Sequence, residues 1–288
     1  MKPTPLMIAR VVWLVLPLGL VPALEGALAG RSAAISILVS MAGWIGWTGG
    51  IVAVLAPRTL GLTYLRIAAP TALVLAIWAA SGGASAAAGV AAVLLTTIAV
   101  VVVLAPAVTD AFVNGSAYGP ESRFALRTPI PILLGPALLV WVLVVGGIAT
   151  GPLLLAAEQW IAGAIATVVG LPVAALAARS LHQLSRRWLV FVPAGLVVHD
   201  PTAVASQLIP RGAVTSIGPA PAGSDAHDLT GGAAGLALQV QLVDPVVFEP
   251  PRTRRARGEP VETDRFLVAP SRPGAVLKEA RARRFALA

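Results

Sequence analysis

The sequence predicts a bundle of about six transmembrane helices over residues 1–186, followed by a small α+β, β-rich domain over residues 187–288. The chain is 57% hydrophobic and 12% charged, with a mean hydropathy of +0.84, whereas a soluble globular domain carries about 25% charged residues. The charges are also unevenly spread. Residues 1–186 hold nine Lys/Arg and four Asp/Glu, and residues 187–288 hold twelve and nine. The composition therefore indicates a membrane domain joined to a polar domain.

Six stretches are apolar over about 20 residues, the length that crosses a bilayer as a helix. The first ends in Ala-Leu-Ala-Gly at 27–30, a small-residue pattern also found at signal-peptide cleavage sites. Cleavage there would leave five spans, but Glu25 and the immediate run into another apolar stretch favour an uncleaved anchor. The predicted spans are about 7–28, 33–55, 65–80, 84–108, 130–149 and 153–177.

The basic residues between these stretches predict the orientation, because cytoplasmic loops are enriched in Lys and Arg. With six spans only Arg31 lies on the opposite side from the others. We therefore expect a multi-pass protein of the bacterial inner (cell) membrane with both termini in the cytoplasm. The residues on the predicted cytoplasmic side are Lys2, Arg10, Arg58, Arg66, Arg123, Arg127, Arg179 and Arg186.

The stretch RRWLVFVPAGLVVHDP, residues 186–201, opens the second domain. Two β-branched and aromatic runs flank Pro-Ala-Gly, so the pattern predicts a hairpin with the glycine free to take a positive φ. A further strand-like pair is expected around Pro-Arg-Gly within 206–218, with more strands in 235–248 and 265–270. A terminal helix with Ser271 as a candidate N-cap completes an α+β order of five or six strands and one helix.

This pattern resembles the bacterial pleckstrin-homology-like (PH-like) domain, a curved sheet capped by a C-terminal helix. The whole chain resembles a family of uncharacterised actinobacterial multi-pass membrane proteins with such a cytoplasmic tail. The resemblance implies a location and an architecture, and no activity. It rests on Arg187, Trp188, Gly195, Leu196, Leu208, Ile209, Pro210, Val214, Ile217 and the segment 270–280.

Ionisable residues within membrane segments are the first candidates for chemistry. Glu25 and Glu158 are predicted near the outer ends of the first and sixth spans, where they can share a proton or bind a cation, or simply lie among the headgroups. Asp110 is predicted near the inner end of the fourth span, where it can pair with Arg123 or Arg127 as a gate, or form a surface ion pair. For each carboxylate the headgroup or surface position is favoured.

Other chemistry is limited by residue types. The chain has no cysteine, which excludes disulfides and thiolate sites. His182, His199 and His227 all follow the predicted spans, and adjacent strand residues such as His199 and Asp200 point to opposite faces. No nucleophile–base–metal set can be assembled, so we expect no catalytic residues, no metal and no cofactor. The residue types therefore argue against an enzyme, and a lipid-modifying membrane enzyme is the third interpretation of the function.

Arginines at the predicted membrane surface suggest contact with anionic lipid headgroups or with a protein partner. Arg123 and Arg127, in the longest inner loop, can also contact headgroups or a partner. Alternatively, their only role is to determine which way the helices cross the membrane. Neighbouring acidic residues and the lack of interleaved aromatics argue against nucleic acid. The candidate contact residues are Arg186, Arg187, Arg252, Arg254, Arg255 and Arg257.

These patterns favour a non-enzymatic adaptor, scaffold or assembly factor in the lipid bilayer, whose tail binds a membrane or cytoplasmic protein or anionic lipid. A transporter or permease-like protein that uses the membrane carboxylates is the alternative.

Overall fold

The computed structural model describes residues 4–251 and 259–288, and they form two compact units. The helical unit extends to Phe112 and resumes over Leu138–His182. The second, the β unit, consists of Val113–Ala137 and Gln183–Ala288. The predicted boundary near residue 186 is close to the second junction. The prediction placed residues 113–137 in the membrane domain, whereas the structure groups them with the tail, although residues 130–137 also begin the fifth long apolar helix.

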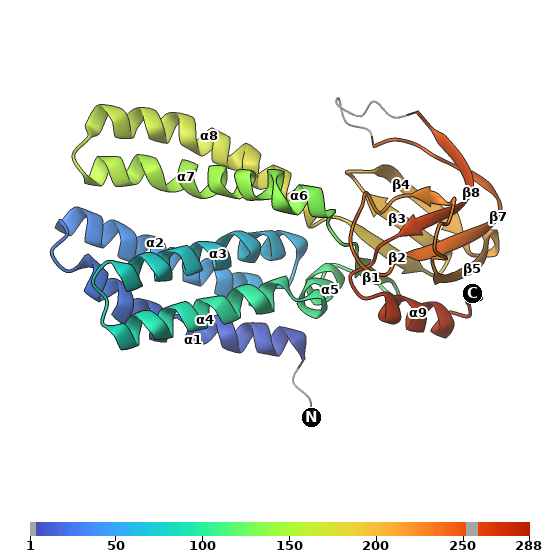
Figure 1. The fold of residues 1–288 in the computed structure, drawn as a ribbon, viewed down its shortest axis with the longest axis horizontal. Coiled ribbons are helices and arrows are strands. Elements are labelled where there is room, and N and C mark those ends of the chain that lie inside the picture. The colour runs from blue at the N-terminus through green and yellow to red at the C-terminus, as the bar shows by residue number, and fades with distance from the viewer. Residues whose placement is uncertain (1–3, 252–258) are drawn as a thin grey trace. The chain divides into compact units, whose positions relative to one another are not determined.

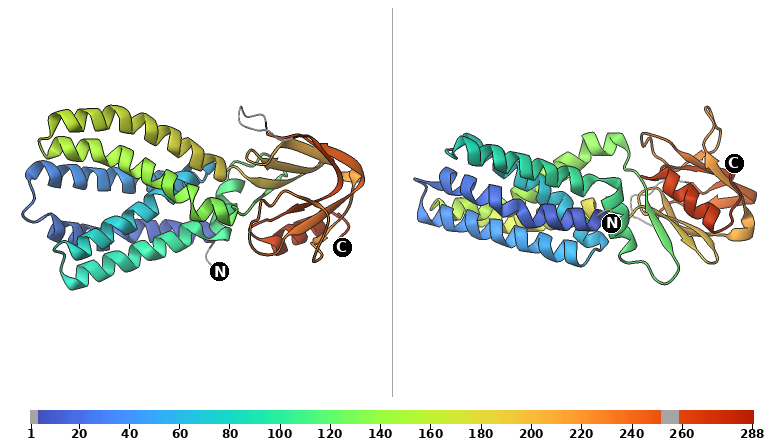
Figure 2. Two further views of the ribbon diagram at one scale, coloured as in Figure 1. Left: turned by 45° about the horizontal axis from the view of Figure 1, so that its top comes forward. Right: turned by 90° about the horizontal axis from the view of Figure 1, so that it is seen from below.

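The structure has six helices that are long and apolar enough to cross a membrane, which agrees with the predicted number and with a multi-pass membrane protein. They follow one another in antiparallel order within the helical unit (Figures 1 and 2). Many large apolar side chains on them are exposed, such as Leu18, Ile45 and Val168, as expected for helices that face lipid. The helices are α1 (Pro5–Leu28), α2 (Ala33–Leu55), α3 (Thr59–Ser81), α4 (Ala86–Leu104), α6 (Ile130–Leu134) continued by α7 (Pro136–Ala156), and α8 (Trp160–Leu184).

Several helix boundaries differ from the predicted ones; for example, α3 begins at Thr59 rather than near residue 65, and α8 ends at Leu184 rather than near residue 177. The fourth span ends at Leu104, and a separate helix, α5 (Pro106–Asn114), begins at the following proline. The predicted break at 150–152 is helical, because α7 continues through Pro152, as membrane helices often do at proline. The chain instead turns at 157–159, where Glu158 adopts the left-handed conformation (φ 63°).

The glycine-rich stretch of α2 accommodates aromatic side chains of the neighbouring helices. A Cβ on Gly50 would collide with the ring of Trp13 from α1, and one on Gly49 would collide with the Tyr64 hydroxyl from α3. The indole N–H groups of Trp13 and Trp47 each donate to the other residue's carbonyl, both at 2.9 Å. Bulky rings from α1 and α3 therefore pack directly against α2 at these glycines.

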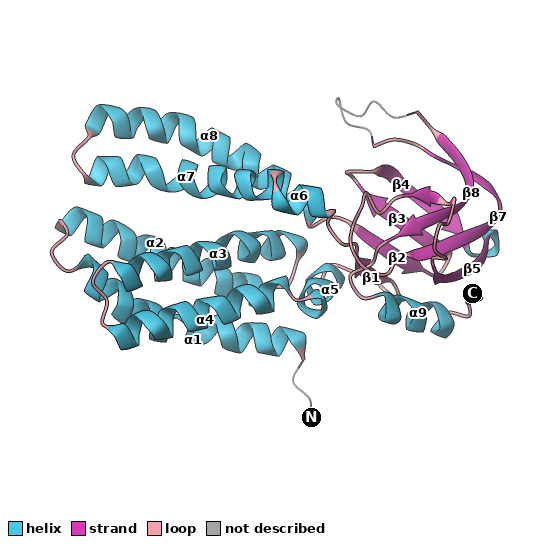
Figure 3. Cartoon of the chain, in the orientation of Figure 1, coloured by secondary structure: helices cyan, strands magenta, loops and turns pink. Residues whose placement is uncertain are grey.

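The β unit contains two four-stranded sheets and a terminal helix, α9 (Pro273–Ala282) (Figure 3). The first sheet has the order β1-β2-β3-β4, and all its pairs are antiparallel. The second has the order β5-β7-β8-β6. The strands are β1 (Ser122–Ala125), β2 (Trp188–Val192), β3 (Gly195–Asp200), β4 (Val204–Pro210), β5 (Val214–Pro219), β6 (His227–Asp228), β7 (Leu238–Phe248) and β8 (Val261–Val268).

One hydrophobic core joins both sheets to α9. Phe191 and Leu196 from the first sheet, Phe266 from the second and Val276 from α9 are completely buried within it. Phe285, just beyond α9, packs edge-on against Phe191 with 5.5 Å between ring centroids. The predicted β-rich domain with a C-terminal helix is therefore present.

Several details of the tail prediction are corrected. The hairpin is confirmed, with Val192 paired to Gly195, and this glycine has the expected positive φ, of 158°. Glycine is needed there because a Cβ would collide with the Ile209 carbonyl oxygen. β4 and β5 do not pair with each other but lie in different sheets. Ser271 is not an N-cap: α9 begins at Pro273, and the Ser271 N–H donates to Ala125 O at 2.8 Å.

Candidate functional site

Glu25 and Glu158 lie at helix ends in the helical unit. Glu25 is exposed in the last turn of α1, and Glu158 is exposed in the turn between α7 and α8. No hydrogen bond or ion pair joins the two carboxylates within the described part of the chain, and no group of three metal-ligating side chains occurs there. Their position agrees with the headgroup interpretation.

Asp110 lies on α5 in a buried polar region of the helical unit and is itself only 5% exposed. The neighbouring residue Thr109 accepts a 2.9 Å hydrogen bond from the Arg66 guanidinium of α3. One turn away on α3, the Thr63 hydroxyl is 2.8 Å from His182 Nδ1 of α8. Sequence reasoning placed Arg66 in a loop and did not combine these residues, because they come from three different helices.

Arg187 is not available to a lipid or a partner, which corrects the prediction. It is 2% exposed and forms a two-contact ion pair with Asp200, in which Nε and Nη2 lie 2.8 and 2.6 Å from Oδ2. Asp200 Oδ1 accepts from the Thr202 N–H and hydroxyl. Arg187 Nη1 also donates to Arg127 O at 2.9 Å, so this buried pair connects the tail to the inter-span segment 113–137.

Arg123 and Arg127 are bound within the β unit. Arg127 donates to Ala234 O at 2.7 Å, and Arg123 forms an ion pair with Glu121 at 3.2 Å. Burial would raise the pKa of the Glu121 carboxyl, but the Tyr118 N–H and Arg123 outweigh it and hold that pKa below its ordinary value. Arg127, through Ala234 O, and Arg123, whose guanidinium lies 5.6 Å from the Trp188 ring centroid, therefore connect the segment 113–137 to the tail.

Arg186 is the one predicted contact arginine in the described part of the chain whose side chain forms no hydrogen bond or ion pair there. It lies beside a stack in which His199 is 4.7 Å from the Trp188 ring and the Arg123 guanidinium covers the same ring at 5.6 Å. Burial and Arg186 lower the pKa of His199, against a smaller opposing effect of Asp200. His199 Nδ1 contacts the Ser206 hydroxyl, so His199 and Asp200 face different partners.

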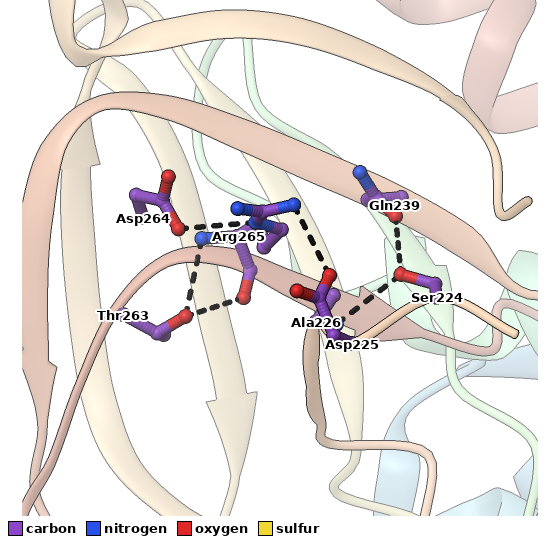
Figure 4. A network of polar contacts seen from close by, with 7 residues as sticks. All are labelled: Ser224, Asp225, Ala226, Gln239, Thr263, Asp264 and Arg265. Atoms are coloured by element: carbon purple, nitrogen blue, oxygen red, sulfur yellow. Dashed lines mark hydrogen bonds and ion pairs between the residues drawn. The ribbon is translucent and has the colours of Figure 1, made fainter.

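The remaining predicted contact residues, Arg252, Arg254, Arg255 and Arg257, lie outside the described residues. On the second sheet, Arg265 links Asp225 and Asp264, and Ser224 bonds Gln239 (Figure 4). This network fixes the loop before β6 to β7 and β8. All of its ion-pair members are exposed at the surface, so it contributes little to stability.

The outer edge of β1 is covered along its whole length. Leu126 N–H donates to Arg187 O toward β2, so by antiparallel alternation the backbones of Arg123 and Ala125 face away from β2. The Asn114 side-chain amide bonds both the N–H and the carbonyl of Arg123. Ala125 O accepts from Ser271 N–H, and the next outward N–H, that of Arg127, donates to Ala269 O.

The edges of the second sheet are also protected. On β5, the Ile217 N–H donates to Ala286 O and the Ile217 carbonyl accepts from Ala288 N–H, so the C-terminal residues cover this edge. β6 is only two residues long and pairs with Phe266 and Leu267, so residues 261–265 of β8 have no strand partner on that side among the described residues. Charged side chains, here Glu262, Asp264 and Arg265, are a common way to limit such an edge.

β4 is different, because it is covered only near its start. Arg211 N–H donates to Ala194 O toward β3, so Ile209 and Gln207 also face β3 and the backbone of Leu208 faces away. Among the described residues, the backbone of this edge has one covering bond, from Ala205 N–H to Glu249 O just after β7. The gap between β4 and β7 forms a groove of about 570 Å³ lined by Pro201, Val204, Ala205, Ser206, Gln207, Val247, Glu249 and Pro251.

No family model, curated protein or solved structure matches the chain. The site must therefore be interpreted from its own geometry. Sequence reasoning did not find the β4 groove, because β4 was expected to pair with the strand that follows it. The one available signal was the lack of any charged residue in Val204–Pro210, which is unusual for an edge strand.

Proposed function

We propose that the protein is a membrane-anchored adaptor or scaffold whose β unit docks a protein partner at the membrane surface. The observation that supports it best is the construction of the β unit from two parts of the chain. The chain passes between the two units three times, after Phe112, before Leu138 and after His182. The β unit is therefore attached to the helices at both ends of its inter-span segment as well as through the tail.

The fate of the candidate chemical groups supports the same proposal. Arg187, Asp200 and Arg123 are held in internal ion pairs, and His199 is held by Ser206 and Trp188. Within the described residues, the Arg186 guanidinium forms no hydrogen bond or ion pair. β2 begins at Trp188, only four residues after α8 ends at Leu184. Four residues span at most about 14 Å, so both side chains can reach the headgroup region and contact anionic lipid.

The proposal includes a location and a fold type. In it the β unit and both termini lie in the cytoplasm of a bacterial cell, with the helices in the inner membrane, because eight of the nine basic residues in 1–186 fall on one side. The two sheets packed with α9 are in keeping with a PH-like domain. Membership of the actinobacterial family remains part of this proposal.

Affinity purification from native membranes tests the docking function. The full-length chain is compared with a variant that ends after Gln183 and has residues 115–128 replaced by a Gly/Ser linker, which removes the β unit completely. We expect a stoichiometric partner on the full-length chain that the variant loses. If both forms purify without a partner, the adaptor proposal is wrong.

Transport is a second candidate, favoured by the buried polar residues Thr63, Thr109 and Asp110 inside the helical unit, with Arg66 bonded to Thr109. Ionisable groups in such positions often mark an ion or substrate path. This function predicts that Asp110→Asn abolishes complementation of a deletion strain, whereas Glu158→Gln, at an exposed turn, does not. Normal complementation by a stably inserted Asp110→Asn variant would contradict transport through this cluster.

A further inference from the structure

We propose that the β4 edge, Val204–Pro210, binds an extended segment of a partner protein as an added β-strand. The inference rests on the docking function proposed above and names the surface and the chemistry of the partner. Addition of a strand to an exposed sheet edge is a general mode of peptide recognition, in which main-chain hydrogen bonds supply affinity and alternate side chains supply specificity.

The hydrogen-bonding groups of β4 determine the type of partner. Leu208 directs its N–H and carbonyl away from β3, and the same alternation directs the Pro210 carbonyl outward. A partner in extended conformation offers the matching donors and acceptors at the strand spacing. Within the described residues, Asn114 and 269–271 cover the β1 edge, and the C-terminal residues cover β5. β6 pairs with only Phe266 and Leu267, so residues 261–265 of β8 also lack a strand partner on that side in the described part of the chain. That stretch carries Glu262, Asp264 and Arg265, and charged side chains discourage strand addition, whereas β4 carries none.

The side chains around β4 narrow the partner further. Leu208 is 50% exposed, and its cross-strand neighbour Val197 lies on the same face, so an apolar partner residue placed beside Leu208 would extend this row. β4 itself carries no charge. Arg211 follows its last residue and is exposed; its guanidinium donates to Arg284 O and covers the Phe285 ring at 5.4 Å, so one cation lies at this end of the strand. The partner segment is therefore apolar at its centre, with acidic residues at the end beside Arg211.

A phage-displayed library of random linear peptides, selected on the full-length protein in detergent, provides the probe. We expect enrichment of peptides with an apolar centre and an acidic flank. A synthetic peptide of the enriched sequence should slow hydrogen exchange at the Leu208 amide. Leu208→Pro removes the outward donor without removing a β3–β4 bond, and Leu208→Lys places a charge at the edge. Loss of the outward bonds should weaken peptide binding about tenfold.

The matched control is Val243→Lys, because Val243 is an exposed apolar residue (62%) on a strand of the other sheet. It should bind the peptide like the unchanged protein. Melting temperature shows that each variant is folded. The proposal is wrong if no sequence is enriched, if Leu208→Lys binds as well as Val243→Lys, or if exchange at Leu208 stays fast. Exchange at Leu208 can also be slowed without peptide, by self-association or by phosphatidylglycerol vesicles. In that case the edge binds a second copy of the chain or lipid, and the proposal is also wrong.

The same variants separate this inference from the docking function. If affinity purification with the Leu208→Lys protein retains a partner that the protein without its β unit loses, docking stands and the β4 site is wrong. If neither protein ever retains a partner, the docking function itself fails.

Discussion

The two outer strands of the first sheet, β1 and β4, belong to the same sheet but have opposite edges. On the side of β1 that faces away from β2, the Arg123 N–H and carbonyl bond Asn114. The Ala125 carbonyl and the Arg127 N–H bond residues 271 and 269. β4 has one such bond, from Ala205 to Glu249. The closed edge belongs to the segment that comes from between two membrane helices, and the open edge belongs to the tail. The inter-span segment therefore completes the sheet, and the β4 edge of the tail is the surface that we propose for partner binding.

The largest effect is expected when β1 is removed. A soluble fragment of residues 183–288 lacks β1, the Arg127 carbonyl that binds Arg187 and the residues that pair with 269–271. We expect it to show no cooperative thermal unfolding by circular dichroism. The same fragment with residues 113–128 fused through a Gly/Ser linker should unfold cooperatively. Equal cooperativity of the two fragments would show that the inter-span segment is dispensable.

Breaking the buried ion pair should have the next largest effect. Arg187→Met leaves the Asp200 carboxylate, which is 0% exposed, without its counter-ion. Such a loss costs about 3–5 kcal/mol in the free energy of unfolding. The double variant Arg187→Met with Asp200→Leu removes both charges and should recover part of that loss in urea titrations of the fused fragment. A single variant as stable as the unchanged fragment would contradict the pair's role.

Opening the β1 edge should cost less. Asn114→Ala removes two hydrogen bonds to the Arg123 backbone, each worth about 0.5–1.5 kcal/mol. We therefore expect a loss of roughly 1–3 kcal/mol in urea titrations. Asn114→Asp retains the acceptor and loses the donor, so it should fall between the two. If the Ala variant is unaffected, the edge is closed by other residues.

The smallest effect concerns pH and His199. Its pKa lies below the ordinary value of 6.5, through burial and Arg186. As pH falls below 6.5 the unfolded chain binds the proton first, so stability should decrease until pH reaches the folded pKa. Glu279, whose lowered pKa results from Arg283 and Ser122 outweighing burial, acts in the same direction, but only below about pH 4.5. Urea midpoints between pH 7 and pH 5 should therefore fall less for His199→Gln than for the unchanged fragment. Equal slopes would exclude His199 as the cause.

The sequence was informative where one local pattern decides the structure. The six apolar stretches and the hairpin from Trp188 to Asp200 were predicted because hydropathy and turn residues are local signals. β1 was missed because SRFA is too short to stand out, and only pairing with β2 makes it a strand. The Arg187–Asp200 pair was missed for a related reason. An arginine after a membrane helix suggests lipid contact, and only the three-dimensional fold brings a buried carboxylate to it.

Site-resolved amide hydrogen exchange of the full-length protein tests the difference between the two edges most directly. A covered edge should exchange slowly and an open edge quickly. The account predicts slow exchange at Arg123, slow exchange at Gln207 and Ile209, and fast exchange at Leu208 between them. If Leu208 is as protected as its two neighbours, or if Arg123 exchanges as fast as Leu208, the assignment of a closed β1 edge and an open β4 edge is wrong.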